Sequence, residues 1–242
     1  MVNILTRKVY VIIVAAGSGT RFGAARPKQF CTLSRHMVLE HSIEAFRRAV
    51  PDAVVTLVLS EYGRDIWLNY CREVGCQSPH VVIGGDTRAD SVVNALIDIE
   101  ANAGIKDDDI VLVHDGARPL LPYEVIYNVL KAVDEDTGVI PVTPVTDSLR
   151  EIEARSSHAV DRSRYRAVQT PQGFNLKALL RAYGLARNLP GYTDDASVFE
   201  AAGGKVVMVD GSPINIKITN PADLSIAEVL INLGAFSNNN ER

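Results

Sequence analysis

The stretch from Val9 to Gln29 reads V-Y-V-I-I-V-A-A-G-S-G-T-R-F-G-A-A-R-P-K-Q. Its opening apolar run, rich in Val and Ile, is typical of a buried strand in a parallel sheet. Glycines directly after such a strand let backbone N–H groups approach an anion, because no Cβ stands in the way. Arg21, Arg26 and Lys28 add positive charge to the same loop. We therefore expect a phosphate-binding loop at the carboxyl end of the first strand, where open α/β sheets bind ligands.

Two other glycine loops and a plain turn are the alternatives. The chain contains no Gly-Lys-Ser or Gly-Lys-Thr, which a P-loop needs. The third glycine, Gly23, comes one residue too late for the dinucleotide pattern G-x-G-x-x-G. A strand-to-helix turn also uses glycine, but it needs no cluster of cations. The length and charge of the loop thus favour phosphate binding.

The composition is that of an ordinary globular enzyme. The chain has 242 residues, of which 47% are hydrophobic and 22% charged, so it can bury a sizeable core as one domain, 1–242. A net charge of −4 argues against a nucleic-acid partner. The three cysteines lack C-x-x-C spacing, which indicates reduced thiols. The first apolar stretch loosely resembles a signal peptide, but a strand is the better interpretation, and no run is long enough to span a membrane. We expect a cytoplasmic protein without a membrane partner.

Strand and helix patterns alternate along the first two thirds of the chain. This alternation predicts an α/β fold, with a mainly parallel sheet covered by helices. The expected strands are 9–14, 53–60, 80–83, 109–113 and 138–142. The expected helices are 38–50, 64–74, 91–103 and a segment around 125–133.

The alternation breaks between residues 144 and 172, which are polar and rich in Arg and Ser. Long excursions from a compact domain are usually functional or disordered. We interpret the segment as a protruding β-arm that could embrace a second subunit. Its expected strand-like pieces are 147–152, 158–161 and 166–169. Beyond it we expect helices 176–187, 194–202 and 222–233, strands 205–209 and 215–219, and a frayed polar tail, 237–242.

Several side chains at the predicted sheet edge could carry chemistry. Asp115 ends a strand and could hold Mg²⁺, bind substrate hydroxyls or merely cap a turn. His114 is a candidate base, although a histidine that ends a buried strand is more often structural. Ser91, near Gly84-Gly85-Asp86, could read the edge of a base or form a helix N-cap. Lys217 alternates with Ile216 and Ile218, which places its amine opposite them. A plain exposed lysine is the alternative.

Cations, carboxylates and glycines dominate these candidates. Thr170 and Arg162, in the arm, offer a hydroxyl and a guanidinium suited to a phosphate. The chain contains no G-x-S-x-G and no H-E-x-x-H. Charge around a polyphosphate without an evident nucleophile indicates nucleotidyl transfer, in which positioning and charge neutralisation provide most of the catalysis.

An ordered set of motifs resembles one family. The motifs are A-A-G-S-G-T-R-F-G…P-K-Q, G-G-D-T-R-A-D-S-V, V-H-D-G-A-R-P, V-D-R, Q-T-P-Q-G-F, T-D-D-A-S and N-I-K-I-T-N-P-A-D-L. In this order they closely resemble the 2-C-methyl-D-erythritol 4-phosphate cytidylyltransferases of the non-mevalonate isoprenoid pathway. The resemblance covers roughly residues 9–233. It implies a Rossmann-like, GT-A-like nucleotidyltransferase fold, a homodimer with interlocking β-arms, and a need for CTP and Mg²⁺. The acceptor's 4-phosphate would attack the α-phosphorus of CTP, and pyrophosphate would leave.

The resemblance also implies roles for individual residues. The residues that would bind the nucleotide are Ala15, Ala16, Gly17, Ser18, Gly19, Thr20, Gly85, Asp86 and Ser91. Those that would neutralise charge at the reacting phosphates are Arg21, Lys28 and Lys217. Those that would hold the acceptor, a small polyol phosphate, are Asp115, Arg118, Ser148, Arg162 and Thr170, the arm residues in part from the partner. Mg²⁺ would be held mainly by the CTP phosphates, with Asp115 as a further candidate ligand. Two positions depart from the family: Ser148 stands where threonine is usual, and Gly116 where alanine is frequent.

Two alternatives stay open at this point. Ribitol 5-phosphate cytidylyltransferase would share the CTP site and differ in its acceptor contacts, but the T-D-D-A-S-V-F-E stretch is more similar to the methylerythritol enzymes. A nucleotide-binding regulator without turnover is the alternative from another class. Lys28 and Lys217 argue against it, because ligand sensing needs no such charge around the α-phosphate.

Overall fold

Strand β1 (Val9–Val14) lies inside the sheet, parallel to both of its neighbours, β4 (Val54–Leu59) and β6 (Ile110–Asp115). The computed structural model describes residues 7–17, 22, 26–186 and 192–234. Alternate side chains of β1 point to opposite faces, so Val11 and Ile13 join one core cluster while Tyr10 and Ile12 join another. The apolar run predicted as a central strand is therefore buried on both faces.

The sheet is mixed and mostly parallel, as expected. Its order is β10-β7-β11-β6-β1-β4-β5, with β12 also pairing β7. The antiparallel pairs are those of β11 with β6 and β7, and of β10 with β7. The remaining strand bounds are β5 (His80–Ile83), β7 (Thr137–Pro144), β10 (Arg166–Val168), β11 (Gln172–Asn175) and β12 (Lys205–Asp210).

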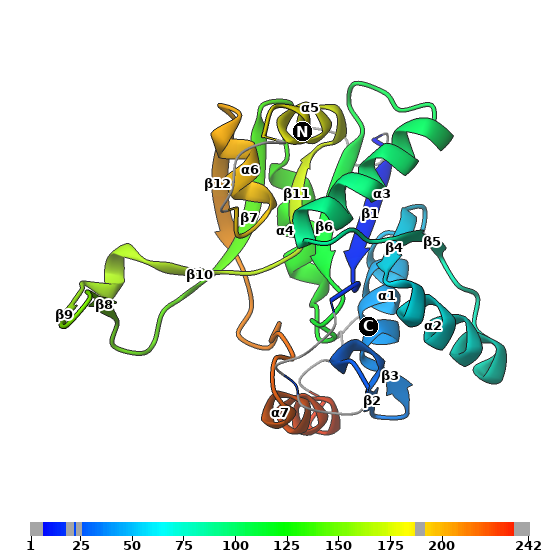
Figure 1. The fold of residues 1–242 in the computed structure, drawn as a ribbon, viewed down its shortest axis with the longest axis horizontal. Coiled ribbons are helices and arrows are strands. Elements are labelled where there is room, and N and C mark those ends of the chain that lie inside the picture. Colours follow the sequence, from blue (N-terminus) through cyan, green and yellow to red (C-terminus); the bar gives the residue numbers. More distant parts are fainter. Residues whose placement is uncertain (1–6, 18–21, 23–25, 187–191, 235–242) are drawn as a thin grey trace, which may run out of the picture.

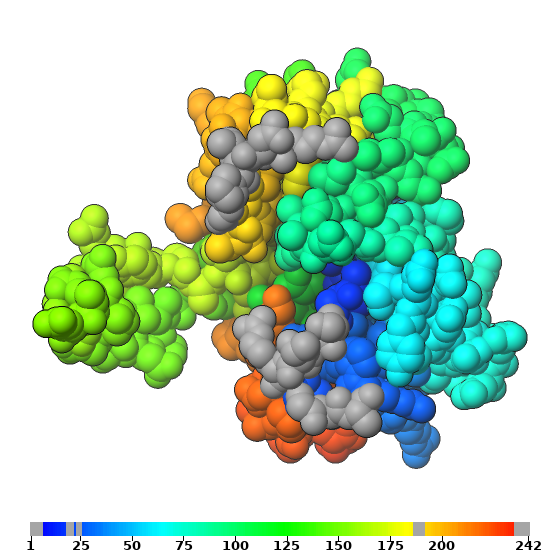
Figure 2. Space-filling view, in the orientation of Figure 1, coloured from blue at the N-terminus to red at the C-terminus, as the bar shows by residue number. Residues whose placement is uncertain are grey.

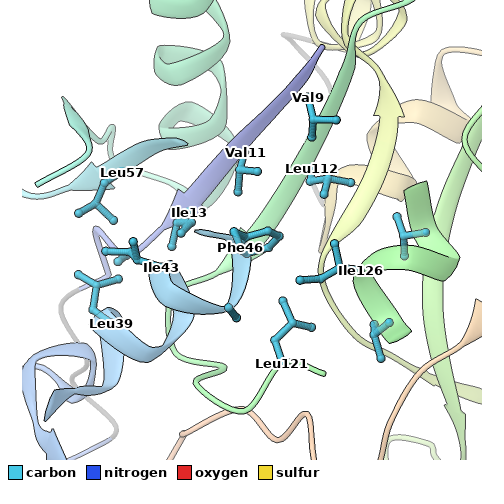
Figure 3. Close-up of a cluster of buried hydrophobic side chains, with 14 of the residues drawn as sticks. Val9, Val11, Ile13, Leu39, Ile43, Phe46, Leu57, Leu112, Leu121 and Ile126 are labelled. Atoms are coloured by element: carbon cyan, nitrogen blue, oxygen red, sulfur yellow. The ribbon is translucent and has the colours of Figure 1, made fainter. Parts of the chain in front are cut away.

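Helices cover both faces of this sheet (Figure 1). One face packs α1 (Val38–Ala49), α2 (Glu61–Val74) and α4 (Tyr123–Ala132). The other face packs α3 (Arg88–Asn102), α5 (Leu176–Ala186) and α6 (Asp195–Ala201). Figure 3 shows Ile43 and Phe46 of α1 beside Ile13 of β1. Replacing a buried phenylalanine by alanine costs about 3–5 kcal/mol, so this helical stripe contributes strongly to the core.

A smaller cluster closes the end of the sheet that carries the glycine loop. Helix α7 (Pro221–Asn232) begins at an Asn220 capping box with proline in its first turn. Its Ala227 packs with Leu33, Leu120 and Ile218. Leu33 belongs to the short pair β2 (Thr32–Leu33) and β3 (His36–Met37). No helix in the described part of the chain is long and apolar enough to cross a membrane.

The arm stands clear of the body (Figures 1 and 2). Its end is an antiparallel hairpin of β8 (Arg150–Ile152) and β9 (Ser157–Ala159), which are shorter than the predicted pieces 147–152 and 158–161. The third piece, 166–169, corresponds to β10 and pairs with β7 in the main sheet. Residue 172 already belongs to β11, an inner strand that the sequence pattern did not indicate.

Three other expectations were wrong. Helix α3 begins at Arg88 rather than at residue 91, because Thr87 caps it and forms a capping box with Asp90. Ser91 is therefore not the N-cap. Likewise α2 begins at Glu61 rather than at residue 64, because the Ser60 side chain accepts a hydrogen bond from the Gly63 N–H. Residues 215–219 form no strand.

The segment 215–219 is irregular because it has no neighbouring strand to pair with. The Ile218 N–H donates to the Ala117 carbonyl at 2.8 Å, a backbone hydrogen bond to the loop after β6 rather than part of a strand pairing. The alternation of side chains still holds: Ile218 is fully buried, while the Lys217 side chain is 44% exposed.

Candidate active site

A cavity of about 620 Å³ opens at the carboxyl ends of β1 and β6. Many of the predicted site residues line it, although they come from distant parts of the sequence. They are Ala15, Ala16, Gly17, Lys28, Gly85, Asp86, Ser91, Asp115 and Lys217. Predicted residues Ser18, Gly19, Thr20 and Arg21 lie outside the described residues. The structure thus brings the described part of the glycine loop together with both predicted lysines.

Gln29 holds the start of the glycine loop. Its Nε2 donates to the Ala15 carbonyl at 2.8 Å and to the Gly17 carbonyl at 2.9 Å. The side chain is buried in the middle of a short 3₁₀ turn, Lys28–Phe30. Gln29 therefore orients the loop from within, a role that the sequence analysis did not assign to it.

The loop after β5 packs closely against the loop after β1. A Cβ on Gly84 would lie 2.5 Å from the Ala16 Cβ and 2.7 Å from the Ser91 Oγ, so only glycine fits there without displacement. The Ser91 hydroxyl donates to the Thr87 carbonyl at 2.9 Å and accepts from the Gly85 N–H at 3.2 Å. Ser91 thus shapes the loop that carries Gly85 and Asp86.

Asp115 is the electrostatic centre of the cavity. Its carboxylate lies 2.7 Å from the Lys217 Nζ, 3.4 Å from the Arg88 Nε and 3.8 Å from the Arg118 Nε. Burial by itself raises the pKa of Asp115, but the positive charges of these three side chains hold that pKa well below its ordinary value. Asp115 is therefore a permanent carboxylate that holds three cations together.

Arg88 connects Asp115 to a second buried carboxylate. Its Nη2 lies 2.7 Å from Asp195 Oδ2, and the Asp195 side chain is fully buried. The Tyr183 hydroxyl donates to Asp195 Oδ1 at 2.6 Å. Burial and the adjacent Asp195 charge both raise the pKa of Tyr183, so the phenol keeps its proton. Arg88 and Asp195 belong to motifs quoted above, but no local pattern in the sequence indicates a role for either of them.

Thr170 and His114 brace Asp115 from behind. The Thr170 hydroxyl accepts from the Asp115 N–H at 3.1 Å and lies 3.0 Å from His114 Nδ1. The His114 Nε2 lies 3.2 Å from the Arg118 carbonyl. Since a carbonyl only accepts, Nε2 carries the proton and Thr170 donates to Nδ1. Burial lowers the pKa of His114 to about 4, which fits a neutral structural imidazole rather than a base.

Arg118 reaches the C-terminal segment. Its Nη1 donates to the Asn215 carbonyl at 2.8 Å, while its buried Nε has no hydrogen-bond partner. The Asn215 side chain in turn donates to the Thr170 carbonyl at 2.9 Å. Arg118, Asn215 and Thr170 therefore form one connected support beneath Asp115.

The two arm residues lie apart from this cavity. Ser148 and Arg162 are exposed, and neither lines it. The Arg162 guanidinium donates to the Thr146 carbonyl beside a separate hollow of about 460 Å³. Within one chain, the structure brings Asp115, Arg118 and Thr170 together but leaves Ser148 and Arg162 on the arm.

The described residues offer no cluster of three or more His, Cys, Asp or Glu side chains for a metal ion. Asp115, the carboxylate considered for Mg²⁺, is already surrounded by Arg88, Lys217 and Arg118. A divalent cation beside it would be repelled by those charges. The donor set therefore fits a metal ion held by ligand phosphates rather than by protein carboxylates.

A glycine loop, cations and an ionised carboxylate meet at the carboxyl ends of parallel strands, and this arrangement defines a nucleotidyltransferase with a Rossmann-like sheet. The sequence profile of the 2-C-methyl-D-erythritol 4-phosphate cytidylyltransferases matches residues 9–233, and the chain belongs to this family. It is a CTP-dependent cytidylyltransferase that forms 4-diphosphocytidyl-2-C-methyl-D-erythritol in isoprenoid precursor synthesis, and the ribitol 5-phosphate alternative is not favoured.

Relatives match over nearly their full length. A 2-C-methyl-D-erythritol 4-phosphate cytidylyltransferase of Azobacteroides pseudotrichonymphae is 44% identical over 229 residues, covering 93% of this chain and 99% of the relative. One of Bacteroides thetaiotaomicron is 41% identical over 225 residues, covering 93% and 100%. The crystal structure of the Thermus thermophilus enzyme superposes with a TM-score of 0.72 at 34% identity, covering 93% of this chain and 99% of that one. A 4-diphosphocytidyl-2C-methyl-D-erythritol synthase gives a TM-score of 0.75 at 29% identity, with the same coverage.

Proposed function

We propose that the reaction takes place in the cavity around Asp115, where the 4-phosphate of the acceptor attacks the α-phosphorus of CTP and pyrophosphate leaves. The observation that carries this proposal is the shared lining of the cavity by Lys28, Asp115 and Lys217. The residues proposed to bind CTP are Ala15, Ala16, Gly17, Ser18, Gly19, Thr20, Gly85, Asp86 and Ser91. Backbone N–H groups of the glycine loop would face the triphosphate.

Charge neutralisation is the proposed catalytic contribution of Arg21, Lys28 and Lys217. The reacting phosphates gain negative charge in the transition state, and fixed cations stabilise it there more than in the ground state. The ion pair of Lys217 with Asp115 holds its ammonium at the cavity wall. When bound through the CTP phosphates, Mg²⁺ would supply further charge neutralisation.

Asp115, Arg118 and Thr170 form the proposed acceptor site, with Asp115 accepting hydrogen bonds from the acceptor's hydroxyls. Ser148 and Arg162 would complete the site of a second copy of the chain. The exposed arm supports this assembly, because its apolar Ile152 is 78% exposed and a homodimer would cover it.

The free cysteines agree with a location in the reducing cytoplasm.

The acceptor is tested by pyrophosphate release in the presence of CTP and Mg²⁺. We expect turnover with 2-C-methyl-D-erythritol 4-phosphate and none with ribitol 5-phosphate. If only ribitol 5-phosphate were turned over, the acceptor would be ribitol 5-phosphate, and the enzyme would activate that polyol phosphate instead. If neither acceptor released pyrophosphate, the cytidylyltransferase activity would be refuted.

Sharing of the site between subunits is tested by mixing two inactive variants, Arg162→Ala and Lys28→Ala. A heterodimer would contain one cavity with Lys28 intact that receives Arg162 from the other subunit. We expect part of the activity to return on mixing. No recovery under subunit exchange verified by native mass spectrometry would contradict an arm that acts in trans.

A further inference from the structure

Helix α2 ends in a pair of thiols that the reaction does not use. The Sγ atoms of Cys71 and Cys76 lie 2.8 Å apart, inside the van der Waals contact distance of two sulfurs. Cys71 is buried, with 6% of the residue exposed, whereas Cys76 is half-buried. Neither residue lines the cavity around Asp115. The pair is therefore a separate dithiol cluster.

The end of the helix fixes this approach. Gly75 adopts the left-handed conformation, with φ of 74°, and both its N–H and that of Cys76 donate to the Cys71 carbonyl. This C-cap folds the chain back, so that residues five apart touch. Beyond it, the Trp67 Nε1 donates to the Ser78 Oγ at 2.9 Å, which holds the following segment against the helix. The contact between the thiols thus follows from backbone geometry rather than from chance side-chain rotation.

A hollow beside the helix end gives access to the pair. It has a volume of about 660 Å³ and is lined by Leu68, Cys71, Arg72, Gly75, Cys76 and Ser78. The Arg72 side chain adds positive charge to this hollow, which attracts a reagent that bears carboxylates. The hollow therefore suits a small anionic disulfide.

We propose that Cys71 and Cys76 form a dithiol site that an anionic low-molecular-weight disulfide, of the glutathione type, oxidises to an intramolecular disulfide. The Cys76 thiolate attacks one sulfur of the reagent, which forms a mixed disulfide and releases one small thiol. The Cys71 thiolate then attacks the Cys76 sulfur and displaces the second small thiol. Two protein thiols lose two protons and two electrons, and the reagent disulfide is reduced to two thiols.

The order of attack follows from burial. Burial, together with the adjacent Cys76 thiol, raises the pKa of Cys71 to about 12, so Cys71 holds its proton in the reduced pair and loses it only in the second step, when it attacks the mixed disulfide. Cys76 is the more accessible sulfur and meets the reagent first. Cys31 is the third cysteine of the chain, and its Sγ faces the Pro27 carbonyl rather than another thiol. It therefore serves as the control for a thiol that reacts without a neighbouring cysteine.

The experiment uses the full chain, reduced and then incubated with oxidised glutathione at pH 8. Intact-mass and peptide mass spectrometry identify the product, and the fluorescence of Trp67, the only tryptophan, follows the reaction. Trp67 lies one helical turn before Cys71 in the same core cluster, and a disulfide there quenches an indole. We expect the protein to lose two hydrogen masses, with a Cys71–Cys76 linked peptide and a fall in fluorescence that dithiothreitol reverses.

Two variants separate this site from general thiol reactivity. Cys31→Ser should behave as the parent chain does. Cys71→Ser should instead accumulate a stable glutathione adduct on Cys76, because the resolving thiol is gone. A stable adduct on Cys76 in the parent chain, reaction at Cys31 alone, or no reaction at all would each overturn the proposal.

Discussion

Replacing Asp195 by asparagine tests whether the Arg88 bridge supports the proposed acceptor site. The substitution keeps the shape of the side chain and the Tyr183 contact at 2.6 Å, but it removes the charge that faces Arg88 at 2.7 Å. Of the two ionic partners that Arg88 has among the described residues, Asp115, at 3.4 Å, would then remain. The substitution therefore removes one charge of a buried ion pair and leaves the other, Arg88, in place, without creating a cavity.

The magnitude follows from burial. Removing one partner of a buried pair costs about 3–5 kcal/mol. The Asp195 side chain is fully buried, but the Arg88 side chain is 28% exposed, so water compensates part of the loss. We expect the free energy of unfolding to fall by about 3 kcal/mol, which corresponds to a melting temperature lower by about 6–12 °C in a domain of this size. Thermal unfolding followed by circular dichroism measures this change.

Activity separates support of the acceptor site from general destabilisation. With Asp195 neutral, Arg88 draws Asp115 away from Lys217 and from the acceptor. We expect kcat/KM for the acceptor to fall about tenfold, a loss of about 1.4 kcal/mol in the transition state. The KM for CTP should stay within about twofold of the value for the parent chain, a change much smaller than the fall in kcat/KM for the acceptor. Steady-state pyrophosphate release at 25 °C, with each substrate varied in turn, measures both constants.

The matched control is Asp107→Asn, the same chemical change at an exposed ion pair. Asp107 lies 2.6 Å from the Lys177 Nζ, but its side chain is 95% exposed, so water and salt weaken the interaction. This variant should melt and turn over as the parent does. If Asp195→Asn shows the melting temperature and the acceptor kcat/KM of Asp107→Asn, the Arg88 bridge does not support the site.

Three further predictions concern the same edge of the sheet. Gly84→Ala places a Cβ 2.5 Å from that of Ala16, so it should raise the KM for CTP severalfold, whereas Gly184→Ala, with open space around it, should not. Steady-state kinetics with CTP varied compares the two. Lys28→Ala should lower kcat far more than the affinity for CTP, and an unchanged kcat with a raised KM would contradict this role. His114 is neutral in the folded protein, where its pKa is about 4. As the pH falls, the imidazole of His114 therefore takes up a proton in the unfolded chain before it does so in the folded protein. Its contribution to the free energy of unfolding should fall by about 2 kcal/mol between pH 8 and pH 5, and urea titrations of His114→Gln should show a flatter dependence on pH.

The strands that could be predicted from the sequence are those with a continuous local signal. β1 and β6 are apolar runs buried on both faces. Since they are parallel, their carboxyl ends lie at the same edge of the sheet, so the residues at these two ends were expected to lie close together. The convergence of Asp115 with the glycine loop followed from this rule. The alternation with Ile216 and Ile218 predicted which way the Lys217 side chain points, but its role in the site came from the resemblance to the family, and its segment forms no strand.

Other parts of the site depend on long-range contacts that leave no local pattern. β11 reads Q-G-F-N, with one large apolar residue, and it is a strand only because β6 and β7 flank it. The Arg88–Asp195 pair joins residues 107 positions apart. Gln29 looks like any polar loop residue until its amide meets the Ala15 and Gly17 carbonyls. In each case the partner is supplied by the folded chain, so a window of sequence contains only half of the interaction.

The link between Arg118 and Asn215, 97 positions apart, has a consequence for biosynthesis. On the ribosome, the strand that ends in Asp115 and the segment that carries Thr170 are complete before the segment 215–219 has been made. Until that segment arrives, the Arg118 guanidinium lacks its carbonyl acceptor and Asp115 lacks Lys217. Domains fold as their chains emerge, but contacts of high sequence separation form late. The emerging chain can therefore assemble most of its sheet while the proposed active site stays incomplete until the segment 215–219 has emerged.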